Sequence, residues 1–166
     1  MVLYAVANLK QGGMKKIIAQ SHLPLIVMDT NVLISGLCRY EHSPSYRILK
    51  SIQEGKTPLA LNQKLFLEYE SVLYRKEILK LTGASSEEIK IVLEALLSIA
   101  LESESYYMWR PNLSDETDNF ILELAVSTSA IIITKNLKDF KSGELKFPDL
   151  IVTTPVKFCE QYLETK

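Results

Sequence analysis

The chain has 166 residues, of which 47% are apolar, and its 19 Lys plus Arg nearly balance its 20 Asp plus Glu, for a net charge of −1. This length and composition fit one globular domain with a buried core and argue against wholesale disorder. The balanced charge argues against a strongly basic binder of nucleic acid, but it is compatible with a local basic rim around an acidic pocket.

Apolar runs and helix-capping residues alternate along the chain. Residues 1–13 are expected to be an extension of undecided role, and residues 14–166 a single domain. Apolar or β-branched runs predict strands, and capping residues ahead of a helical apolar period predict helix starts. In chain order these signals predict a strand at 25–28, helices at 31–38 and 44–54, a strand at 58–61, helices at 63–76 and 86–100, a strand at 106–109, a helix from 115, strands at 130–134 and 150–152, and a helix at 155–163.

Strands separated by helices are typical of βαβ units, so the predicted fold class is α/β, with a parallel sheet covered by helices on both faces. The strand runs lack polar alternation, as expected for strands buried on both sides. In such sheets ligands bind beyond the carboxyl ends of the strands, where the strand order reverses.

The sparse Cys and His residues exclude several kinds of site. Cys38 and Cys159 lack CxxC spacing, so they are expected to be reduced core residues of a cytoplasmic protein. His22 and His42 lack the spacing of a zinc hydrolase, and the glycines form neither a P-loop nor a dinucleotide-binding motif. No apolar stretch approaches the ~20 residues that span a bilayer, so no membrane association is expected.

Four of the five aspartates lie where they could share one edge of the sheet. Asp29 and Asp139 follow two expected strands, and Asp115 and Asp118 lie in the first turn of a helix, whereas Asp149 does not fit. Converging carboxylates repel one another unless a cation neutralises them, and Mg²⁺ or Mn²⁺ prefers such oxygen ligands. Because a metal held this way activates water and stabilises displacement at phosphorus, the pattern favours a site that acts on phosphodiesters.

Each of these aspartates, taken singly, also fits a structural role. Asp115 is better explained as a helix N-cap, and Asp29 could equally cap the helix that follows it. Asp118 would gain from the helix dipole, and Asp139 fits a turn. Their joint placement is what favours a metal site.

Four segments of the chain resemble, in order, the motifs of PIN-domain (PilT N-terminus-like) nucleases. They read DTNVLIS at 29–35, EYESVLYR at 68–75, DETD followed by LELA at 115–125, and TKNLKDF at 134–140. The resemblance runs from about residue 25 to 152 and is closest to the PIN-family toxins of toxin–antitoxin systems. It implies a three-layer α/β/α PIN-like fold over residues 14–166, a homodimer, and divalent-metal-dependent cleavage of RNA.

The same resemblance assigns the site residues position by position. Asp29 and Asp118 would bind the metal, and Glu68 would bind it or orient a ligand. Asn136 stands where the family places a fourth acidic residue and completes the catalytic set, while Asp139 would add charge to the metal site. Supporting hydrogen bonds are expected from Thr30, Asn31, Ser35, Asp115 and Thr134.

The sequence departs from the family pattern at several positions. Asn136 and Asn119 are neutral where many relatives carry acids, so a second metal or full catalytic power is in question. Glu116 and Thr117 replace residues of the family's DPDD run. Without the resemblance, Glu68 would be interpreted as a solvated helix residue.

These features favour a cytoplasmic Mg²⁺- or Mn²⁺-dependent endoribonuclease, a toxin restrained by a cognate antitoxin. The alternative is a degenerate PIN scaffold that binds RNA or a protein without cleaving. A phosphate-accepting receiver-like domain fits least, because the acidic pair ahead of its first helix is missing. Candidate phosphate contacts are Arg39, Arg47, Arg75, Lys76, Lys135 and Lys138, and Tyr106, Tyr107 and Trp109 are candidates for base stacking or for the core.

Overall fold

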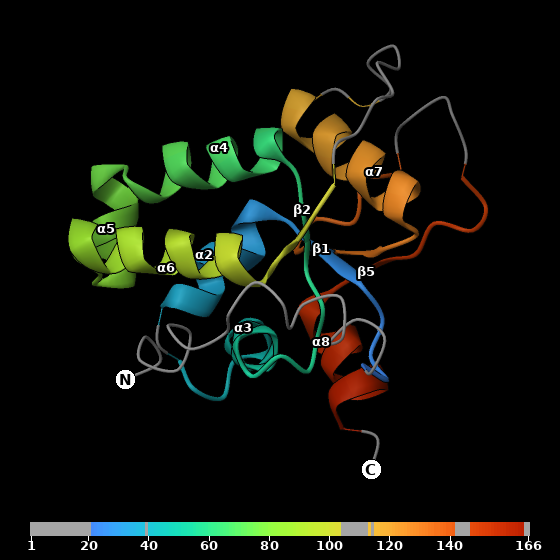
Figure 1. The fold of residues 1–166 in the computed structure, drawn as a ribbon, viewed down its shortest axis with the longest axis horizontal. Coiled ribbons are helices and arrows are strands. Elements are labelled where there is room, and N and C mark those ends of the chain that lie inside the picture. The colour runs from blue at the N-terminus through green and yellow to red at the C-terminus, as the bar shows by residue number, and fades with distance from the viewer. Residues whose placement is uncertain (1–20, 39, 104–112, 114, 142–146, 165–166) are drawn as a thin grey trace.

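The computed structural model describes residues 21–38, 40–103, 113, 115–141 and 147–164 (Figure 1). Its strands are β1 (Ile26–Met28), β2 (Ala60–Leu61), β3 (Leu101–Glu102), β4 (Ile131–Ile133) and β5 (Val152–Thr153). Its helices are α2 (Thr30–Leu37), α3 (Pro44–Gln53), α4 (Gln63–Leu73), α5 (Lys76–Thr82), α6 (Ser86–Ile99), α7 (Glu116–Thr128) and α8 (Pro155–Phe158), the last continued by the π-helical turn η2 (Cys159–Leu163).

Strand β1 lies at the centre of the sheet. It pairs in parallel with β4, which pairs in parallel with β5, and a bridge from Ile26 to Leu59 joins β1 to the chain just ahead of β2. Strand β2 pairs in parallel with β3. The strands thus form a three-stranded sheet, β1-β4-β5, and a two-stranded sheet, β2-β3, and the bridge sets them side by side in the order β3-β2-β1-β4-β5, which reverses between β1 and β4. The carboxyl ends of these two strands are where a parallel sheet of this kind binds its ligand.

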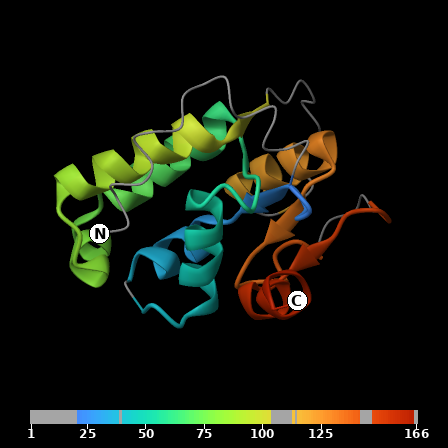
Figure 2. The same ribbon diagram turned by 60° about the horizontal axis from the view of Figure 1, so that its bottom comes forward.

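Helices cover both faces of the sheet. Helix α7 packs against β1, β2 and β4, while α2 packs against α3 and α3 packs against α8. Figure 2 shows the strands running between α7 and the pair formed by α3 and α8. The expected three-layer α/β/α fold with a central parallel sheet is confirmed. None of the helices in the described part of the chain is long and apolar enough to cross a membrane.

Local signals place most of these elements where the sequence predicts them. The Ser43 hydroxyl accepts the Tyr46 amide at 3.2 Å to start α3, and Asn62 caps α4 in the same way. Ser85 and Glu88 form a capping box at the start of α6. The strand residues Ile26–Met28 are fully buried, as their continuous apolar run indicates.

Two elements differ from the sequence prediction. The helix expected over 63–76 ends at Leu73, and α5 starts separately at Lys76 with extended backbone at Arg75. Neither Gly nor Pro marks this break, so no local stop signal reveals it; packing of α5 against α2 and α4 accompanies it. The strand β3 directly follows α6, whereas the strand expected at 106–109 lies outside the described residues.

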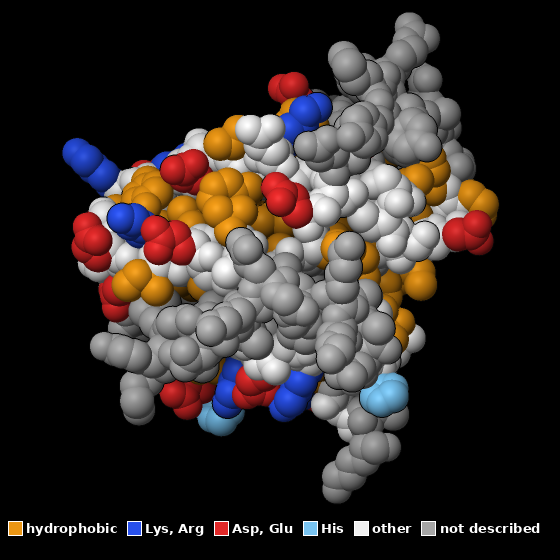
Figure 3. Space-filling view, in the orientation of Figure 1, with side chains coloured by type: hydrophobic (Ala, Val, Ile, Leu, Met, Phe, Trp, Pro, Cys, Tyr) orange, Lys and Arg blue, Asp and Glu red, His pale blue; other side chains and the backbone are white. Residues whose placement is uncertain are grey.

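Helices α4, α5 and α6 form an arm at one side of the sheet (Figure 1). On α6, the side chains of Ile89, Leu93 and Leu96 lie in the core, while Ile91 and Leu97 remain 42% and 48% exposed. Figure 3 shows apolar side chains interspersed with charged ones over these helices. The apolar side chains of α6 are therefore divided between the core and the surface.

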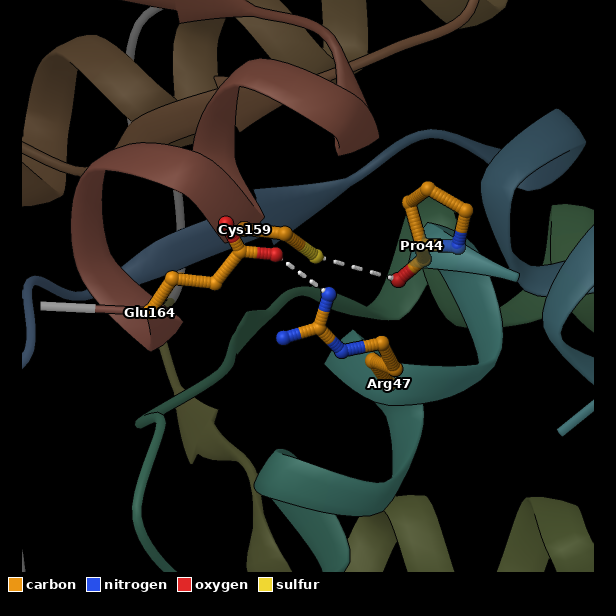
Figure 4. Close-up of polar contacts among 4 residues, drawn as sticks. All are labelled: Pro44, Arg47, Cys159 and Glu164. Atoms are coloured by element: carbon orange, nitrogen blue, oxygen red, sulfur yellow. Dashed lines mark hydrogen bonds and ion pairs between the residues drawn. The ribbon is translucent and has the colours of Figure 1, made fainter. Parts of the chain in front are cut away.

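The C-terminal turn is fastened to α3 (Figure 4). The Arg47 guanidinium donates to Glu164 at 2.7 Å, and the Cys159 thiol donates weakly to the Pro44 carbonyl at 3.5 Å. An exposed ion pair of this kind contributes only about 0–1 kcal/mol. Cys159 is a buried free thiol and Cys38 a partly buried one, as expected from their spacing.

Candidate active site

Asp29 is anchored at the carboxyl end of β1. Its amide donates to the Ile133 carbonyl at 3.0 Å, which continues the β1–β4 pairing to the strand end. Only 8% of the residue is exposed. Its Oδ2 accepts hydrogen bonds from Thr134 Oγ1 at 2.6 Å and from Asn31 Nδ2 at 3.0 Å. The carboxylate is thus turned toward the end of β4, at the point where the strand order reverses.

Thr134 links β4 to this carboxylate. Its side chain is fully buried, and its hydroxyl accepts the Asn136 amide at 3.0 Å while donating to Asp29. The next residue, Lys135, donates its amide to Asn31 Oδ1 at 3.2 Å and its ammonium to Ser35 Oγ at 2.7 Å. The residues predicted to support the site at positions 31, 35 and 134 therefore meet at this one strand end.

Four aspartates share one electrostatic neighbourhood. Burial raises the pKa of Asp29, while the hydrogen bond from Thr134 and the nearby amides of Thr30 and Asn31 oppose the rise. The pKa of Asp118 is raised to about 7, first by burial and then by the negative charges of Asp29, Asp115 and Asp139. Like charges that shift one another in this way favour a cation between them.

The start of α7 shows why Asp115 and Asn119 differ from Asp118. The Asp115 carboxylate accepts the Thr117 amide at 2.8 Å, so it is the N-cap that one interpretation of the sequence favoured. Asn119 is buried and bonds to both the amide and the carbonyl of Leu113 at 2.9 Å. The neutral residue at 119 therefore ties Leu113 to the first turn of α7, a role that its sequence position alone did not reveal.

The remaining predicted residues lie further out. The exposed Asn136 side chain donates to Asp139 Oδ2 in the turn after β4. Glu68 is half-buried in α4 and, among the described residues, makes no hydrogen bond or ion pair with the four aspartates. Asp149 is exposed and was not expected to take part. Of the candidate phosphate contacts, Arg39 lies outside the described residues, as do the aromatic candidates at 106, 107 and 109.

Two further residues adjoin the Asp29 anchor. The buried Tyr69 hydroxyl donates to the Met28 carbonyl, and burial together with the charge of Asp29 raises the pKa of Tyr69 well above its usual value. This position was recognisable only as part of the apolar face of its helix. The buried Thr30 hydroxyl oxygen has no hydrogen-bond partner in the described part of the chain.

This donor set fits a hard divalent cation in its chemistry. No three His, Cys, Asp or Glu side chains in the described residues are close enough together to hold a metal ion. Mg²⁺, however, commonly binds through one or two carboxylates, with water and substrate phosphates as its other ligands. Asp29 and Asp118 offer two carboxylates, and the residue after Asp29 carries the unpartnered, buried Thr30 hydroxyl.

The parallel α/β sheet thus carries an anchored carboxylate at its switch point, where sheets of this kind bind ligands, with further aspartates in its electrostatic range. The family model described as PIN domain matches residues 25–138, more than half of the chain. The chain therefore belongs to the PIN-domain family, whose members are in general nucleases that act on RNA and usually use divalent metals. Comparison with curated proteins and with solved structures gave no match.

Proposed function

We propose that this chain is a divalent-metal-dependent endoribonuclease that hydrolyses RNA phosphodiesters. The observation that carries the proposal is the Asp29 carboxylate, held by Thr134 and Asn31 at the β1–β4 switch point with Asp118 in its electrostatic range. Rigid positioning of this kind lets an active site bind a reacting group without first reorganising.

The site residues have distinct roles in this proposal. Asp29 and Asp118 would hold Mg²⁺ or Mn²⁺, which supplies a Lewis acid and acidifies a water molecule when bound. Thr134 and Asn31 keep Asp29 oriented. Asp118, whose pKa is about 7 without metal, is driven to its ionised form by a neighbouring cation.

The outer residues complete this assignment. Glu68 and Asp139 add negative charge around the metal, and Asn136 holds Asp139 through their hydrogen bond. Ser35 positions Lys135. Thr30 contributes a buried hydroxyl next to Asp29 in the chain, and Asp115 fixes the start of the helix that carries Asp118.

For the biological role, we infer a cytoplasmic toxin restrained by a cognate antitoxin and active as a homodimer. This inference rests on the resemblance of the four motif segments to PIN-family toxins. The exposed Ile91 and Leu97 on α6 offer apolar surface for such a protein partner. We also infer that residues 14–166 act as one PIN-like domain, with residues 1–13 as an extension.

Metal-dependent RNA cleavage tests the enzymatic proposal. The purified chain, Asp29→Asn and the control Asp149→Asn are incubated with labelled RNA in Mg²⁺, in Mn²⁺ and with chelator. We expect wild type and Asp149→Asn to cleave only with metal, and Asp29→Asn to lose at least about 100-fold in rate, because even partners of metal ligands contribute 10–100-fold. Equal activity of wild type and Asp29→Asn, or none under any condition, contradicts the proposal.

A second candidate function is that of a PIN scaffold that binds RNA or protein without cleaving. Asn136 and Asn119 are neutral, and the described residues contain no group of three acidic side chains that could hold a metal, which favours this function. Calorimetric titration with Mn²⁺ separates the two. The nuclease proposal expects a binding isotherm that Asp29→Asn removes and Asp149→Asn retains. The scaffold proposal expects the same heats for all three proteins.

A further inference from the structure

A pocket of about 400 Å³ lies beside the Asp29 anchor. It is bounded by the end of α2, residues just ahead of α3 and the first residues of α3, the second residue after β4, and the start of α8. Its volume falls in the range of pockets that bind small ligands. The residues that line it are Ser35, Cys38, Tyr40, Ser43, Pro44, Ser45, Lys135, Thr154, Pro155 and Val156.

The pocket is connected to the candidate site through Lys135. Its ammonium is fixed to Ser35 at 2.7 Å, so both residues lie at the boundary of pocket and site. The preceding residue, Thr134, is the one that holds the Asp29 carboxylate. When a phosphodiester of an RNA strand lies at Asp29, a neighbouring nucleotide of that strand is therefore close to the pocket.

The lining combines one cation with aromatic and apolar surface. Lys135 is the only charged residue among the described residues that line the pocket, so the pocket is locally positive beside an acidic site. Tyr40 is 72% exposed, which leaves its ring available, and Pro155 and Val156 add apolar wall. A planar base attached to a phosphate matches this combination, since aromatic side chains stack on bases and lysine pairs with phosphate.

Hydroxyl groups at the pocket can contact the polar edge of such a ligand. Ser43 and Thr154 are N-caps of α3 and α8, where each accepts a backbone amide. A hydroxyl that accepts one hydrogen bond still carries a proton that it can donate.

We propose that this pocket binds a nucleotide of the RNA next to the cleaved phosphodiester, with Tyr40 stacking on the base and Lys135 contacting a phosphate. The inference rests on the proposed ribonuclease function and adds to it a subsite with named residues. Tyr40 and Lys135 are thereby substrate-binding residues of this chain.

Binding of a fluorescein-labelled single-stranded RNA, followed by anisotropy in Mg²⁺, tests the subsite. The Asp29→Asn chain keeps the RNA intact and serves as the parent protein. Tyr40→Ala, Tyr40→Phe and Lys135→Ala are added to it. Tyr74→Ala, at the C-cap of α4, and Lys80→Ala, on α5, are matched controls outside the pocket lining. Thermal denaturation verifies that each variant is folded.

We expect Tyr40→Ala to weaken RNA binding by about 5- to 100-fold, the size of one lost base–aromatic stack, and Tyr40→Phe to bind like the parent. Lys135→Ala is expected to make the slope of log affinity against log salt shallower by about 0.7, the value for one phosphate contact to a single strand. Tyr74→Ala and Lys80→Ala are expected to match the parent in both respects.

Equal binding by Tyr40→Ala and Tyr74→Ala, or equal salt slopes for Lys135→Ala and Lys80→Ala, overturns the subsite, as does a parent protein that binds no RNA. Cleavage by the wild-type chain is measured in parallel. Cleavage without any effect of the pocket variants on binding overturns the subsite and keeps the ribonuclease function. The expected binding differences without cleavage by wild type keep the pocket as an RNA-binding site and overturn the ribonuclease function.

Discussion

The two principal carboxylates of the site are held in different ways. Asp29 is buried and receives hydrogen bonds from Thr134 and Asn31, so the protein itself stabilises its charge. Asp118 is half-buried on α7, makes no hydrogen bond within the described residues, and faces the charges of three other aspartates. The charge of Asp29, the anchored half of the site, is therefore stabilised by the fold, whereas Asp118, the open half, loses its proton only near pH 7 when no cation is bound.

The largest loss of stability is expected from a substitution that introduces a charge at the buried position 119, next to Asp118 on α7. Asn119→Asp replaces the amide that donates to the carbonyls of Leu113 and Asp115 at 2.9 and 3.0 Å with a carboxylate. We expect a loss of about 2–3 kcal/mol, because buried carbonyls lose their donor and face a negative charge. Circular dichroism should show a fall in melting temperature of about 5–10 °C.

The exposed Asn136→Asp serves as the control for this substitution, since it adds the same charge at the surface. If Asn119→Asp and Asn136→Asp have the same melting temperature, the hydrogen bonds of Asn119 do not stabilise the start of α7.

In the anchored half, Thr134→Val removes the hydrogen bond to Asp29 with little change of shape. We expect the rate of RNA cleavage to fall by about 10- to 100-fold, as for other residues that orient a metal ligand. The kcat/KM of the variant measures the effect, and Thr153→Val, a buried threonine on the neighbouring strand, is the matched control. Similar losses in both variants would indicate general damage to the sheet.

In the open half, the charge of Asp118 opposes folding of the metal-free protein. Its pKa is about 7 in the folded state against an ordinary value of 3.8, so the folded state binds the proton more tightly. The free energy of unfolding therefore decreases as the pH rises from about 4 to 7 and is constant above that range, as far as Asp118 determines it.

Asp118→Asn removes this contribution. Because water screens a half-buried group, we expect a gain of only about 1 kcal/mol, or about 2–4 °C, at about pH 8, and little gain at about pH 4. Thermal melts of both proteins in chelator at the two pH values measure it. A gain of the same size at both pH values would show that charge is not the cause.

The smallest effect is expected from adding a carboxylate to the open half. Asn136→Asp restores the acid that many relatives carry but loses the hydrogen bond to Asp139. We expect Mn²⁺ to bind about fivefold more tightly, since an exposed charge near a cation contributes about 1 kcal/mol in water. Calorimetric titration with Mn²⁺ measures the affinity. The control Asn31→Asp adds a carboxylate next to Asp29 instead, so comparing the two variants shows whether the gain depends on position 136. Weaker binding by Asn136→Asp than by wild type would contradict the proposed position of the metal.

Much of the fold was predictable because its signals are local. The capping box at Ser85, the N-caps at Ser43 and Asn62, and the apolar strand runs each specify an element through neighbouring residues. The break between α4 and α5 and the strand β3 were not predictable in this way. They accompany packing between elements that are distant in the sequence, for which the local pattern carries no mark.

For the site, the sequence by itself determined the residue types: an aspartate after each of two strands, the aspartates at the start of α7, and the motif segments of the PIN-domain family. Only the tertiary structure decided which of these aspartates is buried with hydrogen-bond partners and which faces like charges. Parallel pairing of β1 with β4 brings Asp29 to Thr134, 105 residues away, and buries that pair. Tertiary packing also places Asp118 among like charges and brings Asn119 into hydrogen-bonding contact with Leu113. Burial and hydrogen-bond partners depend on contacts that sequence spacing does not specify.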